Sequence, residues 1–341
     1  MKHFASLTVL AAAFLMLPAC SSHRALGPSA GQLSLAMVTD VGGLGDKSFN
    51  DSAYRGLLQA KTDLGAFVQV LQSRSAADYE PNLAALTNRH PSMIYAIGFL
   101  MNADLDQIAK QNPKQRYAIV DAVVDEPNVV SATFKEEDGS FLAGALAALV
   151  SKTHHIAFLG GQDIPLLRKF EAGFFAGARE VDPNTRVDVK YVDSFVDVAA
   201  GQELANVLYS GGADVIFAAA GKAGLGAINA AKARSGAYVI GVDSDQDGLA
   251  PGKILTSMVK HVDVAVLDIA RGVKNGKTPS GHLVLGLKEH AVGLTDFAYT
   301  KKTIGDKTLA RIAVLRNAIV SGKIVPPSTR QALAAFTPVK I

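Results

Sequence analysis

Short apolar runs alternate with longer amphipathic stretches along most of this chain. The apolar runs of its first half have the length and composition of strands: LSLAMVT, FVQVLQS, MIYAIGF, RYAIVDAVV and NVVSATF. The stretches between them have helical spacing and begin near Asn50, Asp78 and Asn102. Because strands that alternate with helices usually form parallel sheets with crossover connections, this half of the chain predicts an α/β unit.

The same pattern starts again after the small-residue helical segment GSFLAGALAALVSK. The strand candidates of the second half are HIAFLGG, RVDVKYV, DVIFAAA, AYVIGVD and ILTSMVK, again with helical stretches between them. One sheet containing all of these strands would be unusually large, whereas two sheets of ordinary size fit the spacing. The pattern therefore predicts an α/β protein with two doubly wound lobes.

The N-terminal segment MKHFASLTVLAAAFLMLPAC has a different character. It combines a basic start at Lys2, an apolar run over residues 7–17 and small residues before a cysteine, which is typical of an export signal. Its end, LPAC, matches a bacterial lipobox in which Cys20 is the lipidated residue, and Cys20 is the only cysteine of the chain. We expect a signal peptide at residues 1–19 and a polar, lipidated tether at residues 20–32. A buried free thiol behind an ordinary signal peptide is the alternative.

Hydropathy and charge exclude several classes of protein. The apolar run of residues 7–17 is shorter than the ~20 residues that a membrane-spanning helix needs, and no later stretch qualifies. With no cysteine to pair after Cys20, the exported domain must be held by its core rather than by disulfides. The formal net charge of +3 falls by one when Lys2 is removed, and the basic residues are scattered along the sequence. Nucleic-acid binding is therefore unsupported.

Carboxylates and aromatic rings follow the predicted strands. In open parallel sheets a ligand binds beyond the carboxyl ends of the strands. A carboxylate accepts hydrogen bonds from hydroxyl groups, and an aromatic face stacks on a planar ring. The mixture suits a neutral, hydroxyl-rich ligand with a flat part. The residues at these positions are Asp40, Phe99, Asp121, Phe217 and Asp243.

The loop GDKSFN, residues 45–50, follows the first predicted strand. Ser48 and Asp51 have the spacing of a capping box, so Ser48 is expected to cap a helix that starts at Phe49. Phe49 and Asn50 would then lie in the first helical turn, at the end of the strand. Phe49 would offer a ring, and Asn50 would offer the donor and the acceptor that the edge of a base demands. Alternatively, Phe49 packs as a hydrophobic anchor of the loop.

Two glycine-rich loops, DVGGLGD and AAAGKAGLGAI, raise the question of a phosphate ligand. Neither has the G-x-G-x-x-G pattern in the right place, and Asp40, Asp46 and Asp51 around the first loop would repel a pyrophosphate. A nucleoside is therefore favoured over a nucleotide. No nucleophile motif occurs, and the aspartates of GVDSDQDG lack the glutamate of an EF-hand because Ile254 stands in its place. We predict no catalytic residue, no metal site and no cofactor.

Several long motifs together resemble the basic membrane protein family, the purine-nucleoside-binding lipoproteins of bacterial ABC importers. They include DVGGLGDKSFNDSAYRGL, FLGGQDIPLLRKFEAGFFAGA and GVDSDQDGLAPGKILTSMVKHVDVAV, and the resemblance runs from residue 33 to about residue 323. It implies a type I periplasmic-binding-protein fold, in which two lobes close on a ligand through a multi-segment hinge. The expected lobes are residues 33–150 with 262–290, and residues 151–261 with 291–341.

The resemblance also implies roles for particular residues. Phe49 and Phe217 would sandwich a purine, one from each lobe. Asn50 and Asp121 would bind the edge of the base, with Asp40 nearby.

On the sugar side, the resemblance implies that Asp243 takes the ribose hydroxyls with the help of Lys260. Gly221 would allow a close approach of the backbone. Many relatives have a second glycine where this chain has Lys222, and a side chain there could contact the sugar or narrow the pocket.

The sequence thus predicts a monomeric, lipid-anchored extracytoplasmic protein that captures nucleosides, above all purine nucleosides, and delivers them to an ABC permease without catalysing a reaction. One alternative is a binding protein of the same fold for a sugar or signal molecule that feeds a sensor. Another is an exported enzyme that cleaves nucleosides or uses NAD.

Overall fold

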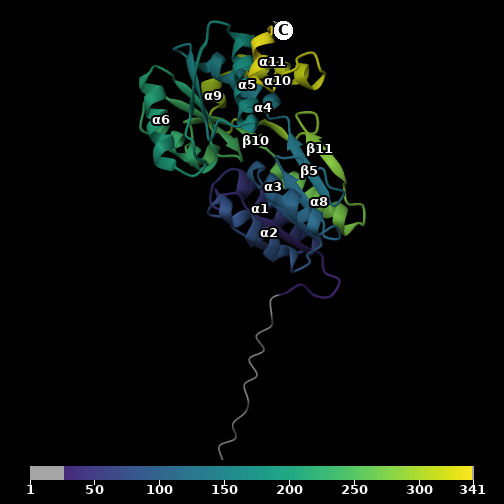
Figure 1. Ribbon diagram of the computed structural model, residues 1–341. Coiled ribbons are helices and arrows are strands. Elements are labelled where there is room, and N and C mark those ends of the chain that lie inside the picture. Colours follow the sequence, from purple (N-terminus) through teal and green to yellow (C-terminus); the bar gives the residue numbers. More distant parts are fainter. Residues whose placement is uncertain (1–26, 340–341) are drawn as a thin grey trace, which may run out of the picture.

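The computed structural model describes residues 27–339. The expected signal peptide and Cys20 lie outside these residues. The described chain forms two lobes, each with a six-stranded sheet between helices (Figure 1). Within the described residues, no helix is both long and apolar enough to cross a membrane.

Lobe 1 is built mainly from the first part of the chain. Its sheet has the order β11-β5-β4-β3-β1-β2, with all neighbouring strands parallel. The elements are β1 (Ser34–Val38), α1 (Phe49–Leu64), β2 (Phe67–Leu71), α2 (Tyr79–Thr87), β3 (Met93–Ile97), α3 (Asn102–Gln111), β4 (Tyr117–Val120), β5 (Val129–Phe134), α8 (Val262–Lys274) and β11 (Gly281–Leu285).

Lobe 2 repeats this topology. Its sheet has the order β12-β10-β9-β8-β6-β7, and only β12 runs antiparallel to its neighbour. The elements are α4 (Glu136–Val150), β6 (His155–Gly160), α5 (Pro165–Val181), β7 (Arg186–Tyr191), α6 (Val198–Ser210), β8 (Val215–Ala219), α7 (Gly224–Lys232), β9 (Tyr238–Asp243), β10 (Ile254–Lys260), β12 (Val292–Leu294), α9 (Lys301–Ile304), α10 (Asp306–Val320) and α11 (Arg330–Ala335).

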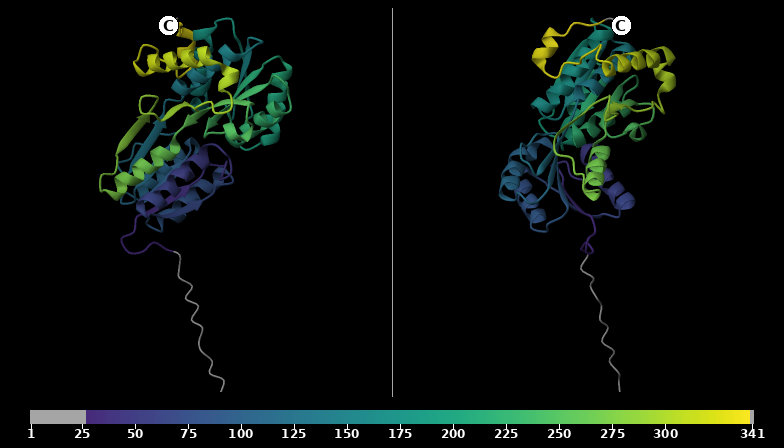
Figure 2. Two further views of the ribbon diagram at one scale, coloured as in Figure 1. Left: turned by 180° about the vertical axis from the view of Figure 1, so that it is seen from behind. Right: turned by 90° about the vertical axis from the view of Figure 1, so that its right-hand side faces the viewer.

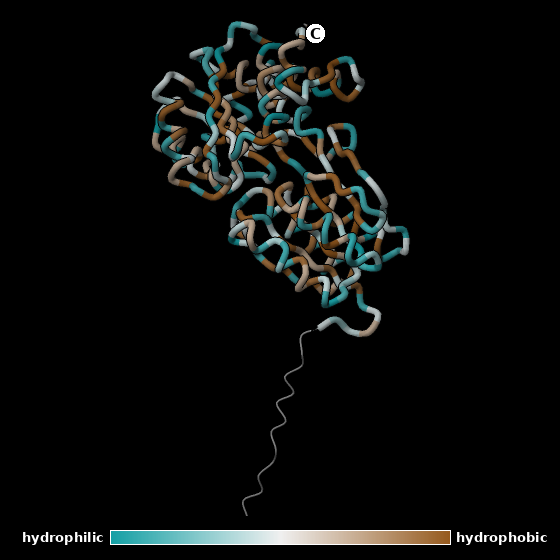
Figure 3. Tube along the Cα trace, viewed as in Figure 1, coloured by the Kyte–Doolittle hydropathy of each residue, from teal (hydrophilic) through white to brown (hydrophobic). Residues whose placement is uncertain are grey.

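The prediction of two doubly wound lobes is confirmed. Each predicted apolar run forms a strand, and the central strands are buried on both faces because helices cover the sheet. All residues of β1, β3 and β4 are buried, and the hydropathy colouring shows apolar strands inside both lobes (Figure 3). Strands β11 and β12 were not predicted, since β11 is partly exposed and β12 has only three residues.

The described chain crosses between the lobes between β5 and α4, between β10 and α8, and between β11 and β12. These segments lie side by side where the lobes meet (Figure 2). Helix α4 packs along α5 and against β12 and β10, so it belongs to lobe 2. The boundary expected after residue 150 therefore differs from the structure, in which the first crossing falls before residue 136. Small residues allow α4 and α5 to pack closely. A side chain at Gly144 of α4 or at Gly177 of α5 would collide with the backbone of the other helix.

Candidate functional site

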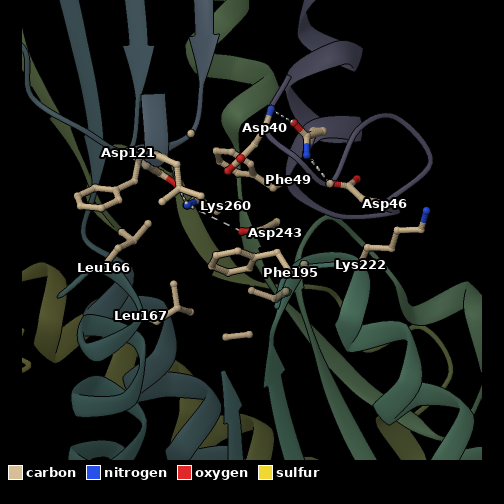
Figure 4. Close-up of a pocket in the computed structure, with 18 of the residues that line it drawn as sticks. Asp40, Asp46, Phe49, Asp121, Leu166, Leu167, Phe195, Lys222, Asp243 and Lys260 are labelled. Carbon is tan, nitrogen blue, oxygen red and sulfur yellow. Dashed lines mark hydrogen bonds and ion pairs between the residues drawn. The ribbon is translucent and has the colours of Figure 1, made fainter. Parts of the chain in front are cut away.

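A cavity lies between the lobes, at the carboxyl ends of strands from both sheets (Figure 4). It encloses about 640 Å³ of space free of protein atoms, part of which opens to solvent. Lobe 1 supplies the segments after β1, β3 and β4, and lobe 2 supplies the segments after β6, β7 and β8 together with the last residues of β9 and β10.

All but one of the predicted binding residues line this cavity. Those that line it are Asp40, Phe49, Asn50, Asp121, Gly221, Lys222, Asp243 and Lys260. The exception is Phe217, which is fully buried within β8.

The ring of Phe217 packs in the core of lobe 2, with ring centroids 5.5 Å from Phe174 and 5.7 Å from Phe158. The expectation that Phe217 forms a wall of the site therefore does not match its position. Phe217 is in the middle of the strand and faces the helices, while Ala219 at the strand end reaches the cavity. An aromatic ring of lobe 2 comes instead from Phe195, in the loop after β7, which projects into the same space as Phe49 (Figure 4).

Further apolar groups complete the walls. Phe99 follows β3, as expected of a strand-end residue. The segment after β6 adds apolar side chains where α5 begins. This segment is part of the family motif FLGGQDIPLLRKFEAGFFAGA, but the motif did not indicate which of its residues line the site. The lining residues of this segment are Ile164, Leu166, Leu167 and Phe170.

The loop GDKSFN is organised by Asp46. Helix α1 begins at Phe49 as predicted, but the side chain of Ser48 makes no capping bond. The carboxylate of buried Asp46 instead accepts hydrogen bonds from the backbone N–H groups of Ser48 (2.9 Å), Asn50 (2.8 Å) and Asp51 (3.1 Å). Burial raises the pKa of Asp46, and these donors oppose that shift. Asp46 thus caps the helix, which frees Ser48 for another contact.

Asn50 is held on both sides of its amide. Its Oδ1 accepts from the backbone N–H of Asp40 at 2.9 Å, and its Nδ2 donates to Asp46 at 3.0 Å. One N–H and one lone pair remain for a ligand. The Asp40 carboxylate accepts a hydrogen bond from the Tyr79 hydroxyl, and burial raises the pKa of Asp40.

Lys260 is the buried cation of the site. Its Nζ lies 2.6 Å from Asp121 Oδ2, 3.6 Å from Glu136 Oε1 and 3.9 Å from Asp243 Oδ1. It also lies 4.8 Å from the centre of the Phe49 ring. Burial alone would lower the pKa of Lys260, but the carboxylates outweigh it and raise the pKa, so the ammonium is charged. Because Asp121 belongs to lobe 1 and Lys260 ends β10 of lobe 2, this ion pair joins the lobes.

Asp121 and Asp243 occupy matching positions, after the fourth strand of lobe 1 and at the end of the fourth strand of lobe 2. Both have left-handed backbone conformations, with φ of 68° and 62°, a strain that concentrates at functional sites. Asp121 Oδ1 is buried without a hydrogen-bond partner. Such an oxygen is costly to leave unpaired, so it marks a place for a ligand donor.

Asp243 is bound across the cleft by Ser48, whose hydroxyl donates to Asp243 Oδ2 at 2.6 Å. Burial raises the pKa of Asp243 to about 6, although Lys260 and Ser48 act in the opposite direction. Asp243 Oδ1 makes no hydrogen bond within the described residues, which leaves it available to a hydroxyl group.

Gly221 has a φ of 55°, which favours glycine. Lys222 follows it at the cavity edge, and its side chain runs away from the space between Phe49 and Phe195 (Figure 4). No ion pair of Lys222 with a carboxylate occurs in the described part of the chain. Residues 27–339 also contain no cluster of His, Cys, Asp and Glu that could hold a metal ion.

Two doubly wound lobes with a cavity between their facing strand ends define a type I periplasmic binding protein. The sequence of residues 33–330 matches the model of the Bmp family, whose description is ABC transporter substrate-binding protein PnrA-like. The chain belongs to this family and is an extracytoplasmic substrate-binding protein of an ABC transporter. The predictions of this family and of its fold are thus confirmed.

Relatives cover nearly the whole chain. It is 38% identical to the CD4+ T-cell-stimulating antigen of Listeria monocytogenes, over 94% of this chain and 97% of that protein. It is 36% identical to the ABC transporter nucleoside-binding protein BmpA of Lactococcus lactis, over 93% and 96%. A crystal structure of an ABC transporter solute-binding protein from Aeropyrum pernix superposes with a TM-score of 0.82 at 28% identity, covering 89% of this chain and 96% of that one.

Proposed function

We propose that this protein captures nucleosides, purine nucleosides above all, and delivers them to its ABC permease from a lipid anchor on Cys20. The observation that carries the ligand assignment is the cavity itself, which combines aromatic rings from both lobes with carboxylate oxygens that lack donors. The name of the Lactococcus lactis relative, a nucleoside-binding protein, supports the same ligand class.

In this proposal Phe49 and Phe195 take the two faces of the base. Each stack on an aromatic ring is worth about 1–3 kcal/mol. Asp121 Oδ1 accepts from an N–H group of the base, since that oxygen has no partner of its own. The free N–H and lone pair of Asn50 bind the same edge, with Asp40 nearby.

The ribose lies toward Asp243. The Oδ1 atom of Asp243 accepts a hydrogen bond from a ribose hydroxyl group. The nearby ammonium group of Lys260 favours the ionised carboxylate that accepts this bond. A phosphate is disfavoured because Asp40 and Asp46 line the cavity and repel it where solvent screening is weak. The described residues supply binding groups and no nucleophile paired with a base, which favours binding over catalysis.

Mass spectrometry of the ligand that stays bound through a mild purification tests the ligand class. We expect a nucleoside. Release of a sugar without a base, or of a nucleotide, would contradict the proposal.

The lipid anchor is tested by Cys20→Ser, which removes the thiol that carries the lipid. Because two acyl chains give stable anchoring, the native protein should stay with the membrane after a high-salt wash, and the processed variant should be released. A variant that remains bound through this wash would exclude the lipoprotein assignment.

A further inference from the structure

The end of lobe 1 opposite the cleft carries a group of exposed basic side chains, which we call the basal surface. Helices of a doubly wound lobe run antiparallel to the strands, so their C-termini gather at this end. Lys61 lies in the last turn of α1 and Lys274 in that of α8. The basal surface comprises Lys61, Lys114, Arg116, Lys274 and Lys277, all of them exposed.

The N-terminal segment enters the fold at the basal surface (Figure 1). Residues 31–33 line one depression together with Lys114, Arg116 and Lys274. The side-chain amide of Gln32 donates to the backbone carbonyl of Gly65 at 2.9 Å, which fixes the chain there. Whatever holds the N-terminus therefore holds this end of the molecule.

The five basic side chains of the basal surface are not held in ion pairs. Two other basic residues at this end are paired: Lys110 Nζ lies 2.6 Å from Asp106, and Arg271 Nη1 lies 2.8 Å from Asp268. In residues 27–339 none of the five basal side chains forms an ion pair with a carboxylate. Arg116 donates to the hydroxyl of Thr278 and Lys274 to the carbonyl of Leu64, and neither partner carries a charge.

The proposed anchor would keep this surface close to a bilayer. Ten residues lie between Cys20 and Gly31. A chain of that length spans no more than about 40 Å when fully extended. The field of an anionic bilayer decays over about 8–10 Å, so it acts on the basal surface whenever the anchored protein approaches to that distance.

We propose that the basal surface contacts anionic phospholipid headgroups and holds lobe 1 against the membrane, with lobe 2 directed away from it. This rests on the proposed lipid anchor for its location, while the charge that drives it lies in the folded lobe. Each basic residue near an anionic bilayer strengthens binding by up to about fivefold. The acyl chains attach the protein to the membrane, and the contact of the basal surface orients the attached protein.

The test uses residues 20–341 with Cys20→Ser, which contain both lobes complete and no site for a lipid. Co-sedimentation is measured with vesicles of phosphatidylcholine alone and of phosphatidylcholine mixed with phosphatidylglycerol. We expect binding to the mixed vesicles that high salt abolishes. The triple variant Lys114→Gln, Arg116→Gln, Lys274→Gln should bind them at least about tenfold less.

A matched control removes the same charge from lobe 2 through Lys301→Gln, Lys302→Gln and Lys307→Gln, which are exposed residues of α9 and α10. This variant should bind the mixed vesicles like the parent. Equal binding of the parent to both kinds of vesicle, or equal losses in the two triple variants, would overturn the proposal. Nucleoside affinity should be the same in all three proteins, so a failure to bind nucleosides would count against the proposed ligand and not against the basal surface.

Discussion

Three phenylalanines have different surroundings in the structure: Phe49, Phe195 and Phe217. Phe49 and Phe195 line the cavity from opposite lobes, whereas Phe217 is fully buried against Phe158 and Phe174. A ring that stacks on a ligand contributes to affinity, and a ring in the core contributes to the free energy of unfolding. The three residues can therefore be separated by measuring both quantities.

We expect Phe49→Ala and Phe195→Ala each to weaken nucleoside binding by about 1–3 kcal/mol with a small change in the melting temperature of the ligand-free protein. Phe217→Ala should lower the free energy of unfolding by about 3–5 kcal/mol. Calorimetric titration and thermal unfolding measure the two effects. If Phe49→Ala melted several degrees lower and bound nucleosides normally, Phe49 would be a loop anchor.

Asp243 gives the site a dependence on pH. Its pKa in the free protein is raised to about 6 by burial. A ribose hydroxyl donates to the ionised carboxylate, so a ligand that binds this form becomes weaker as the pH falls through 6, by up to about tenfold per pH unit. Asp243→Asn should abolish this dependence on pH.

Ser48→Ala provides a second test of the role of the Asp243 carboxylate. The Ser48 hydroxyl stabilises the ionised form of Asp243, and its removal should move the midpoint of the affinity profile to higher pH. An unchanged midpoint, or affinity that rises at low pH, would show that Asp243 does not accept the ligand in its ionised form.

At the scale of elements, the C-terminal helix α11 supports one wall of the cavity. Arg330 donates two hydrogen bonds to Glu171, at 2.8 Å and 2.7 Å, and its Nη2 lies 3.1 Å from Asp163. These two acids flank the segment of α5 that contributes Leu166, Leu167 and Phe170 to the site. Helix α11 near the C-terminus thus fixes the position of apolar lining residues.

Arg330→Gln should lower the free energy of unfolding by about 1–2 kcal/mol, because Glu171 stays buried while Arg330 itself is partly exposed. It should also weaken nucleoside binding. Arg330→Lys keeps the charge but loses the two-pronged geometry, so it should restore only part of the affinity. Wild-type affinity in Arg330→Gln would show that α5 keeps its place without this contact.

Strands and helices could be predicted where burial produces a recognisable pattern of apolar residues in the sequence. The apolar runs of both lobes gave the strands, whereas exposed β11 and three-residue β12 carried too weak a signal. The strand-end rule found Asp40, Asp121 and Asp243, whose chain position alone places them at the cleft. It failed for Phe217, because Phe217 lies in the middle of β8 and only Ala219, at the strand end, reaches the cavity.

Phe195 and the lining residues of α5 were missed for a different reason. They stand several residues beyond their strands, and their approach to the cavity depends on how each loop folds back. The role of Ser48 also depends on tertiary structure, because its partner Asp243 belongs to the other lobe and lies 195 positions further along the chain. Local spacing favoured a helix cap, and the tertiary contact with Asp243 replaced it.

At the scale of the whole molecule, the lobes contact each other through the loop GDKSFN. Besides the bond from Ser48 to Asp243, the hydroxyl of Ser244 donates to the Ser48 carbonyl at 2.7 Å, and Gln246 Nε2 donates to the Lys47 carbonyl at 2.9 Å. These bonds stabilise the closed arrangement by themselves. A ligand held by both lobes adds to them, since it binds the closed form more tightly than the open form.

Ser244→Ala removes one of these bonds without altering the cavity lining. The closed form should lose about 0.5–1.5 kcal/mol, which reduces the apparent affinity for nucleosides and speeds their dissociation. Stopped-flow binding measures both rates. Unaltered dissociation would indicate that the loop contact does not contribute to closure.

The central claim is that the cleft binds the base and the sugar of a nucleoside together and rejects phosphate. Calorimetric titration of the ligand-stripped protein with guanosine, inosine and adenosine, their monophosphates and free ribose tests it most directly. We predict a dissociation constant of about 1 μM or lower for at least one purine nucleoside, at least about tenfold weaker binding of its monophosphate, and no measurable binding of ribose. Monophosphate binding as tight as that of the nucleoside, or ribose binding without any response to nucleosides, would contradict the account.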